Sequence, residues 1–236
     1  MEKRDLLFEG SSKRLYSTDR ENLAVLEYTD DFIIQPNGSR TIVPGKGEVN
    51  LGIATFLFQY LENYHVPTHF VERIGKNEML VRRLKMIPIE VVVYNAISSR
   101  LAQRFKLEDG HQIDFPIIEY FLKSPRLGNP MINETHALAL GYAKPDDMRA
   151  MGRMASKANA ILKSLFERRG LQLVEFKLEF GMSGDNIYIG DEISPDTSRY
   201  FDRKRNRRLE REKYIQDLAT VEKVYRELFE RLTRAV

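Results

Sequence analysis

The feature that most constrains the fold is an alternating run near the C-terminus, Leu173–Phe180, which reads LVEFKLEF. From residue 174 onward its even positions are apolar, whereas positions 175, 177 and 179 carry charge. Such alternation predicts a β-strand with one buried face, because successive side chains of a strand point to opposite sides. Burying the charged row would cost too much free energy, so we expect that row to face water or a ligand.

A second apolar run, Asn186–Ile193, follows the turn sequence GMSGD, so the two runs predict a hairpin. A three-residue turn over residues 183–185 places Lys177 opposite Asp191, with Glu179 diagonal to both. A two-residue turn shifts the register by one residue and sends Asp191 to the apolar face. The first register gathers two carboxylates and an ammonium group, which suits Mg²⁺ bound together with phosphate oxygens. The alternative is a half-exposed strand with cross-strand ion pairs.

A second candidate site lies near the N-terminus, in Glu9–Tyr16 (EGSSKRLY), between two strand-like runs. Gly10 permits a close backbone approach to a phosphate, Ser11 and Ser12 offer donors, and Lys13 supplies charge. The segment lacks the second glycine and the following helix of a Walker loop. Taken alone, it is more simply a plain hairpin turn.

The two hairpins together favour a nucleotide held with its metal between two lobes. Lys85–Pro88 (KMIP) separates two strand-like runs and is a candidate hinge that offers backbone groups to adenine. Lys123, at the end of another such run, is a candidate second phosphate contact.

The remaining segments predict an α+β fold of two lobes. Branched residues predict a β-meander in the first third, then strands at residues 68–74, 78–84, 89–95 and 114–123. Apolar residues at helical spacing predict helices at residues 49–64, 98–105, 145–170 and from about Leu209 to the end. We expect an antiparallel β-rich N-terminal lobe at residues 1–86, an α/β lobe at residues 87–236, and a nucleotide-binding cleft between them.

Composition excludes several classes of protein. Without cysteine, the chain forms neither disulfides nor cysteine-based zinc sites. The net charge is only +3 and no apolar run is long enough to span a membrane, so we expect a cytoplasmic protein that binds neither membrane nor nucleic acid. The one basic stretch, Asp202–Lys213, is more simply a solvated first turn of the last helix with intrahelical ion pairs. The four histidines lack metal-ligand spacing and are expected to be non-catalytic.

Eight segments resemble one enzyme family in order and spacing. They are EGSSKRLY, KGEVN, VPTHF, MIPIEVVV, FLKS, NPMINE, LVEFKLEFG and GDEISPDTSRYFD. The family is the SAICAR synthetase (phosphoribosylaminoimidazole-succinocarboxamide synthase) family of purine biosynthesis. The resemblance implies a two-lobed fold with ATP between the lobes, Mg²⁺ as cofactor, and a homodimer as a common assembly. It further implies a ligase that joins L-aspartate to the carboxylate of carboxyaminoimidazole ribonucleotide through an acyl phosphate, giving SAICAR, ADP and phosphate.

The resemblance also assigns expected roles to individual residues. Glu179 and Asp191 would hold Mg²⁺, and Lys177 would neutralise the reacting carboxylate, which makes these three the expected catalytic set. The expected ATP-binding residues are Gly10, Ser11, Ser12, Lys13, Met86 and Lys123. The expected substrate-binding residues are Arg100, Lys177, Ser198 and Arg199.

Four places depart from the family pattern. The family usually has lysine at Ser11, arginine at Tyr94, serine at Arg100, and a small Ser-Ala-containing loop at Asp31–Ser39. Tyrosine cannot replace a bidentate arginine–phosphate contact, and we expect Arg100 to restore the charge from a neighbouring position. Two alternatives stay open beside the SAICAR reaction: the same chemistry on another substrate, or nucleotide binding without turnover. The presence of Lys177, Glu179, Asp191 and Arg199 disfavours the second alternative, because binding alone would not need these charged residues.

Overall fold

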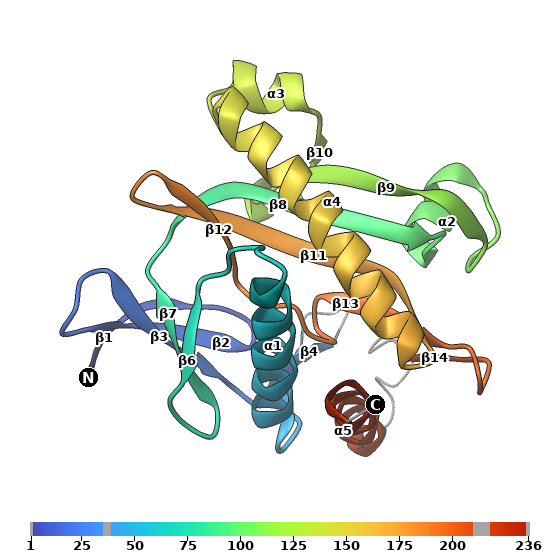
Figure 1. Ribbon diagram of the computed structural model, residues 1–236, viewed down its shortest axis with the longest axis horizontal. Coiled ribbons are helices and arrows are strands. Elements are labelled where there is room, and N and C mark those ends of the chain that lie inside the picture. The colour runs from blue at the N-terminus through green and yellow to red at the C-terminus, as the bar shows by residue number, and fades with distance from the viewer. Residues whose placement is uncertain (1, 35–38, 210–217, 235–236) are drawn as a thin grey trace.

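The computed structural model describes residues 2–34, 39–209 and 218–234, which form two antiparallel sheets with helices packed around them (Figure 1). The first sheet comes from the first third of the chain and has the strand order β1-β2-β3-β7-β6. Its strands are β1 (Lys3–Glu9), β2 (Lys13–Thr18), β3 (Leu23–Tyr28), β6 (Phe70–Arg73) and β7 (Glu78–Arg82). A separate pair is formed by β4 (Asp31–Ile34) and β5 (Ser39–Ile42). The expected meander is present, because β1, β2 and β3 pair consecutively.

The second sheet carries the alternating run at its centre. Its order is β10-β9-β8-β11-β13-β14, and β12 also pairs with β11. Its strands are β8 (Lys85–Ala96), β9 (Gln112–Leu122), β10 (Met131–Ile132), β11 (Leu171–Ser183), β12 (Asn186–Gly190), β13 (Ser198–Asp202) and β14 (Arg207–Leu209). Because β11 lies between β8 and β13, its charged face has a neighbouring strand on each side.

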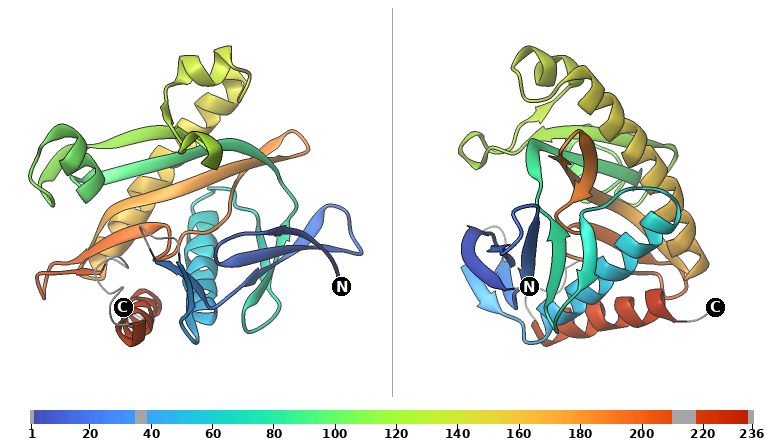
Figure 2. Two further views of the ribbon diagram at one scale, coloured as in Figure 1. Left: turned by 180° about the vertical axis from the view of Figure 1, so that it is seen from behind. Right: turned by 60° about the vertical axis from the view of Figure 1, so that its left-hand side comes forward.

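The helices cover the outer faces of the sheets. They are α1 (Lys46–Asn63), α2 (Ser99–Phe105), η1 (Pro125–Leu127), α3 (Glu134–Ala139), α4 (Pro145–Arg168) and α5 (Leu218–Thr233). Helix α4 crosses the second sheet, and α5 lies across α1 (Figures 1 and 2). Helix α4 begins as expected at Pro145, where the Asp147 carboxylate accepts a hydrogen bond from the backbone N–H of Lys144 at 3.0 Å. None of the described helices is long and apolar enough to cross a membrane.

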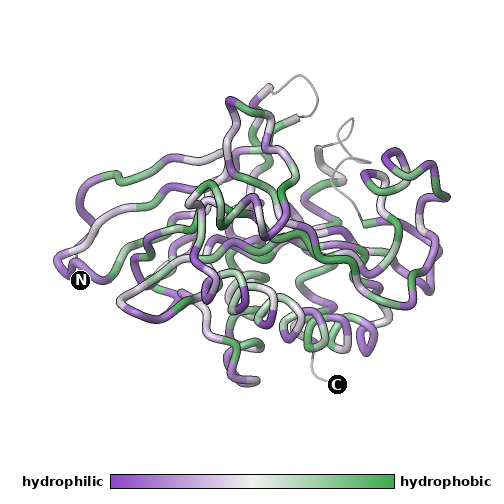
Figure 3. Tube along the Cα trace, turned by 90° about the horizontal axis from the view of Figure 1, so that it is seen from above, coloured by the Kyte–Doolittle hydropathy of each residue, from purple (hydrophilic) through white to green (hydrophobic). Residues whose placement is uncertain are grey.

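One main apolar core joins the two sheets with α1, α4 and α5, and apolar segments gather in the inner strands (Figure 3). A smaller core between the second sheet and α2 contains Val92, Tyr94 and Leu101. The first sheet ends at residue 82 and the second begins at residue 85, next to the predicted lobe boundary at residue 86, which stays a prediction. The expected α+β class agrees with this arrangement of antiparallel sheets and packed helices.

Two local predictions near the C-terminus are wrong. Leu209 ends strand β14 instead of starting the last helix, which is described from Leu218 onward; residues 210–217 lie outside the described part. The described part of the basic stretch, residues 202–209, is a hairpin, because the Asp202 carboxylate accepts from the backbone N–H groups of Lys204 and Arg205 and so closes a turn. Its cations pair with other elements, as in the Arg207–Glu227 contact of 2.7 Å.

Lys85–Pro88 does not separate two strands either, because it opens β8. Proline is tolerated there because the register between β8 and β11 shifts at this point, between the Glu179–Glu90 and Gly181–Met86 pairs.

Candidate active site

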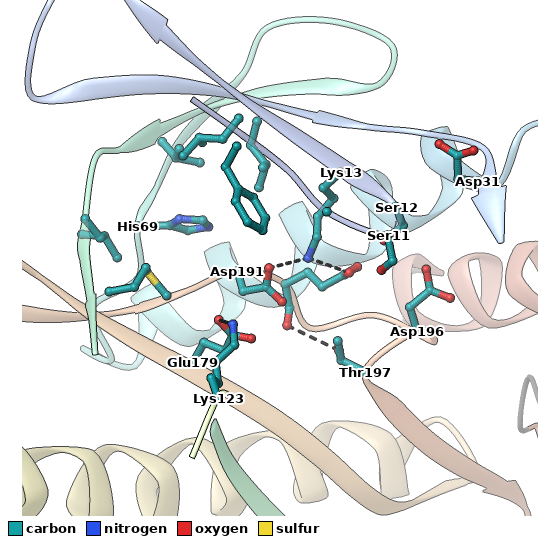
Figure 4. A pocket seen from close by; sticks show the side chains of 18 of the residues that line it. Ser11, Ser12, Lys13, Asp31, His69, Lys123, Glu179, Asp191, Asp196 and Thr197 are labelled. Atoms are coloured by element: carbon teal, nitrogen blue, oxygen red, sulfur yellow. Dashed lines mark hydrogen bonds and ion pairs between the residues drawn. The ribbon is translucent and has the colours of Figure 1, made fainter. Parts of the chain in front are cut away.

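A cavity of about 690 Å³ lies between the two sheets, and charged side chains from both converge in it (Figure 4). The predicted residues that line it are Gly10, Ser11, Ser12, Lys13, Met86, Lys123, Glu179 and Asp191. The structure therefore brings the two predicted hairpins to one place.

Lys13 is the central cation of this cavity. The backbone N–H of Gly10 donates to the carbonyl of Lys13 at 2.8 Å and closes the β1–β2 tip. The Lys13 Nζ lies 2.5 Å from Oδ1 of Asp191 and 2.7 Å from Oε1 of Glu192. Burial opposes the charge, but the two carboxylates outweigh it and raise the pKa of Lys13 above its usual value. The lysine is therefore charged and held in place before any ligand binds.

The β11–β12 hairpin has the shorter of the two turns considered, since Glu179 pairs with Gly190. This register was expected to send Asp191 to the apolar face. Strand pairing ends at Gly190, however, and Asp191 has a left-handed φ of 58°. The side chain of Asp191 consequently turns into the cavity towards Lys13 (Figure 4). A non-glycine residue in this region of backbone space is strained, and such strain is typical of functional positions.

Glu179 and Asp191 form the predicted metal pair. Glu179 accepts a hydrogen bond from Lys123 of the segment that follows β9. Burial, and then the neighbouring Asp191 carboxylate, raises the pKa of Glu179 to about 7, although Lys123 opposes the rise. Burial acts on Asp191 in the same direction, but Lys13 outweighs it and the pKa of Asp191 is lowered. Two half-buried carboxylates that repel each other suit a cation between them.

Magnesium fits this donor set. Among the described residues, no three metal-ligating side chains assemble into one group. Mg²⁺ bound together with nucleotide phosphates needs only one or two protein carboxylates. Glu179 and Asp191 supply that number of carboxylates, and each is paired with a lysine in the structure.

Met86 lies at another wall of the cavity, 43% exposed and opposite Gly181 in the sheet. A Cβ added to Gly181 would come within 3.0 Å of the Met86 Sδ and 2.8 Å of the Leu84 Cβ. Glycine is therefore needed here so that β8 can pass closely over β11.

The charged face of β11 continues beyond the cavity. Lys177 shares it with Glu179, and the Lys177 Nζ lies 3.1 Å from Oε1 of Glu90 on β8. Two residues earlier on β11, Glu175 is the backbone neighbour in the sheet of Tyr94 on β8 and of Arg199 on β13. The face thus leads from the predicted metal pair to two of the predicted substrate positions.

Tyr94 and Arg100 lie at the far end of this face. Tyr94 is fully buried beneath α2, and burial, followed by the Glu175 carboxylate, raises the pKa of its hydroxyl, while Arg100 opposes the rise. Arg100 is exposed at the start of α2, with its guanidinium carbon 5.4 Å from the ring centroid of Phe121. Tyr94 is therefore a neutral phenol, and the cation is on the helix above it.

Ser198 lies on the opposite side of its strand from Arg199. It pairs with the core residue Phe176 and is fully buried, so it points away from the charged face. The structure thus separates Ser198 from Arg199, because adjacent residues of a strand face opposite ways, and the substrate contact of Ser198 stays a prediction.

Among the cavity residues that were not predicted as site residues are Glu192, His69 and Asp196. Glu192 follows Asp191 directly and holds the other side of Lys13, a role that becomes visible only once Lys13 is placed. His69 is buried, which lowers its pKa to about 4, so its imidazole is neutral. Sequence spacing gave no signal for His69, because strand pairing across the fold brings it to the cavity.

Known proteins resemble this chain along its whole length. A family model described as SAICAR synthetase matches residues 6–232. The phosphoribosylaminoimidazole-succinocarboxamide synthase of Desulfitobacterium hafniense is 39% identical over 232 residues, 98% of each chain. The crystal structure of the synthase from Ehrlichia chaffeensis matches with a TM-score of 0.92 at 33% identity, over 98% of this chain and 100% of that chain. A SAICAR synthetase in complex with ADP matches with a TM-score of 0.90 at 35% identity, over 96% of this chain and 97% of that chain.

These matches confirm the expected α+β fold and the expected enzyme class, an ATP-dependent carbon–nitrogen ligase of purine biosynthesis. The chain therefore belongs to the SAICAR synthetase family.

Proposed function

We propose that this chain joins L-aspartate to the carboxylate of carboxyaminoimidazole ribonucleotide, with ATP as the co-substrate and SAICAR, ADP and phosphate as products. The observation that carries the proposal is the convergence of Lys13, Glu179 and Asp191 in one cavity beside Lys177. Phosphoryl transfer depends on such positioning and charge neutralisation more than on a protein nucleophile.

ATP binds in the cavity between the sheets, as the ADP complex of a relative supports. The Gly10–Lys13 tip and Lys123 bind the phosphates, and Met86 lies beside adenine. Glu179 and Asp191 hold Mg²⁺, which when bound neutralises charge on the transferring phosphoryl group. Lys13 and Lys123 then exchange carboxylate partners for phosphate oxygens, so the cavity keeps its charge balance when the nucleotide enters.

Lys177 holds the substrate carboxylate, whose oxygen attacks the γ-phosphorus while ADP leaves. The resulting acyl phosphate has a good leaving group where the carboxylate had none. The aspartate amine attacks the acyl carbon, phosphate departs, and a carboxylate of the site accepts the amine proton. Arg199 and Arg100 bind the phosphate of the ribonucleotide at the far end of the charged face.

The proposal is tested by ADP release with ATP, Mg²⁺, L-aspartate and the carboxylated imidazole ribonucleotide, each omitted in turn. The expected result is release that requires all four components. Tight ATP binding without turnover of that ribonucleotide would overturn the proposed substrate.

A second candidate is the same chemistry on another carboxylic acid or acceptor. It is favoured by the neutral, buried Tyr94, which offers a substrate phosphate no charge, and by the departure at Asp31–Ser39. In that case ADP release would appear only when a different acid or amine replaces the ribonucleotide or aspartate.

We further propose a cytoplasmic enzyme without a nucleic-acid partner and with a homodimer as its assembly. Three cations of the described basic hairpin, Arg205, Arg207 and Arg208, are already paired with acids, as in the Arg208–Asp109 contact of 2.7 Å, which supports the absence of nucleic-acid binding. Light scattering of the purified protein tests the dimer.

A further inference from the structure

Helix α5 contacts the segment that carries Arg199 at two points, one on each side of that residue. The Tyr225 hydroxyl donates to Oδ1 of Asp196 at 2.8 Å, three residues before Arg199. The Arg231 Nη1 lies 2.5 Å from Oδ2 of Asp202, three residues after it. The two contacts come from one helix, six residues apart, so the helix grips the segment at both ends.

The front contact is part of a buried network. The second carboxylate oxygen of Asp196, Oδ2, accepts from Lys46 Nζ at 2.6 Å and from Asn50 Nδ2 at 2.8 Å, both on α1. The Lys46 side chain is only 1% exposed and that of Asp196 only 9%. Asp196 also lines the cavity (Figure 4). Breaking a buried charge pair of this kind costs much free energy, because each charged group would be left unpaired.

The rear contact is enclosed on the side of its carboxylate, although the Arg231 side chain is 22% exposed. Asp202 is fully buried, and its hydrogen bond from Arg231 outweighs burial and lowers the pKa of the carboxyl group. The Arg231 Nη2 also donates to the carbonyls of Arg169 at 3.0 Å and Gly170 at 3.3 Å. Arg231 therefore ties the end of β13 to the loop between α4 and β11.

Between the two contacts, backbone pairing holds the segment: β13 pairs with β11 along its length and with β14 from Tyr200 onward. Strand β13 has five residues, and its outer neighbour β14 has three. The turn before β13 is closed by the backbone N–H of Thr197, which donates to the carbonyl of Ser194 at 3.0 Å, with Asp196 inside that turn. Strand pairing thus sets the face on which Arg199 lies, and α5 holds the carboxylates on either side of it.

We propose that Tyr225 and Arg231 are positioning residues through which α5, by holding Asp196 and Asp202, sets Arg199 for the ribonucleotide substrate. The identity of the ligand that Arg199 binds rests on the proposed function, whereas the positioning itself does not. The C-terminal helix is then a working part of the active site, although it contributes no group to the reaction.

The main test variant is Tyr225→Phe, which removes only the hydroxyl. Arg231→Lys is the second, since it keeps the charge opposite Asp202 but loses the fork to the two carbonyls. Val224→Ala is the matched control, a small cavity in the same buried face of α5. Arg226→Ala is the surface control, because Arg226 pairs with Glu222 on the same helix.

Hydrogen exchange measured peptide by peptide gives the decisive result. For Tyr225→Phe we expect amides in residues 191–202 to exchange about fivefold faster, while those in α4 are unchanged. In turnover assays the KM for the ribonucleotide should rise about fivefold and that for ATP should stay within about twofold. Val224→Ala should lower the Tm and leave both patterns as in the wild type.

Uniform exchange across the chain, or a Tyr225→Phe profile equal to that of Val224→Ala, would make α5 merely structural and overturn the proposal. If the wild type does not turn over the ribonucleotide, the proposed function fails, and the exchange comparison still decides the positioning role.

Discussion

Replacing Lys13 by methionine should destabilise the ligand-free protein and increase its response to magnesium. The Lys13 side chain is 12% exposed and neutralises two carboxylates, at 2.5 Å and 2.7 Å. Removing one partner of a buried ion pair costs about 3–5 kcal/mol. Because the Asp191 side chain is 27% exposed, water will relieve part of that cost, so we expect the lower end of the range. In a chain of this size, that corresponds to a fall in Tm of roughly 6–12 °C.

The assay is thermal unfolding followed by circular dichroism, with MgCl₂ compared against NaCl at equal ionic strength. Magnesium should raise the Tm of Lys13→Met more than that of the wild type, because the cation no longer competes with an ammonium group. Lys3→Met is the matched control. Lys3 also bridges two carboxylates, Glu27 and Glu78, but its side chain is 34% exposed, so its loss should cost under about 1 kcal/mol and create no magnesium response.

A Lys13→Met protein that melts with the wild type, or that gains no more from magnesium than the wild type does, would refute this reasoning. Either result would mean that Lys13 is not the counter-charge of Asp191 and Glu192, and the proposed exchange of lysine for Mg²⁺ and phosphate would lose its basis.

Three further predictions concern turnover, stability and ligand binding. Asp191→Asn should lower kcat by at least about 100-fold with the fold intact by circular dichroism, and near-normal activity would remove Asp191 from the metal pair. Since the pKa of Glu179 is raised to about 7, the folded protein holds that proton longer than the unfolded chain does, so the contribution of Glu179 to stability falls as pH rises towards 7. Mg²⁺ and ATP should correspondingly bind more tightly above pH 7 in calorimetry, with a weaker pH dependence in Glu179→Gln; equal slopes would count against the assignment. Arg100→Ser should raise the KM for the ribonucleotide roughly tenfold and leave that for ATP unchanged, and an unchanged ribonucleotide KM would take Arg100 out of the site.

The hairpin that carries the metal pair shows what local sequence determines. Alternation in Leu173–Phe180 predicted the strand and its charged face, because burial of one face is a local property of the pattern. The register was not determined, since GMSGD accommodates turns of two or three residues. The left-handed backbone of Asp191 was not predictable either, because its ion pair with Lys13 comes from 178 residues away.

The prediction for the basic stretch, a helical turn with intrahelical ion pairs, was wrong for a related reason. Its charges at helical spacing favoured intrahelical ion pairs, but a local pattern of cations does not say where the anions are. In the described part, the partners are Glu227 on α5 and Asp109 in the loop after α2, both distant in sequence. The turn signal was present all along in Asp202, whose side chain closes an Asx-type turn, and in Asn206, which has a φ of 49°.

Predictability within the site therefore follows sequence distance. The ATP side depends on two hairpins, each formed within about 20 residues, and resemblance identified both. The proposed ribonucleotide side depends on Arg199, whose segment is held by Lys46 and Asn50 from α1 and by Tyr225 from α5. None of these three shows a pattern that links it to Asp196, because hydrogen bonds between distant segments leave no periodic trace. If α5 does position Arg199, substitutions far from the cavity in sequence should change the binding of the ribonucleotide more than the binding of ATP. The departures from the family pattern at Tyr94 and Arg100 lie at that same end of the charged face.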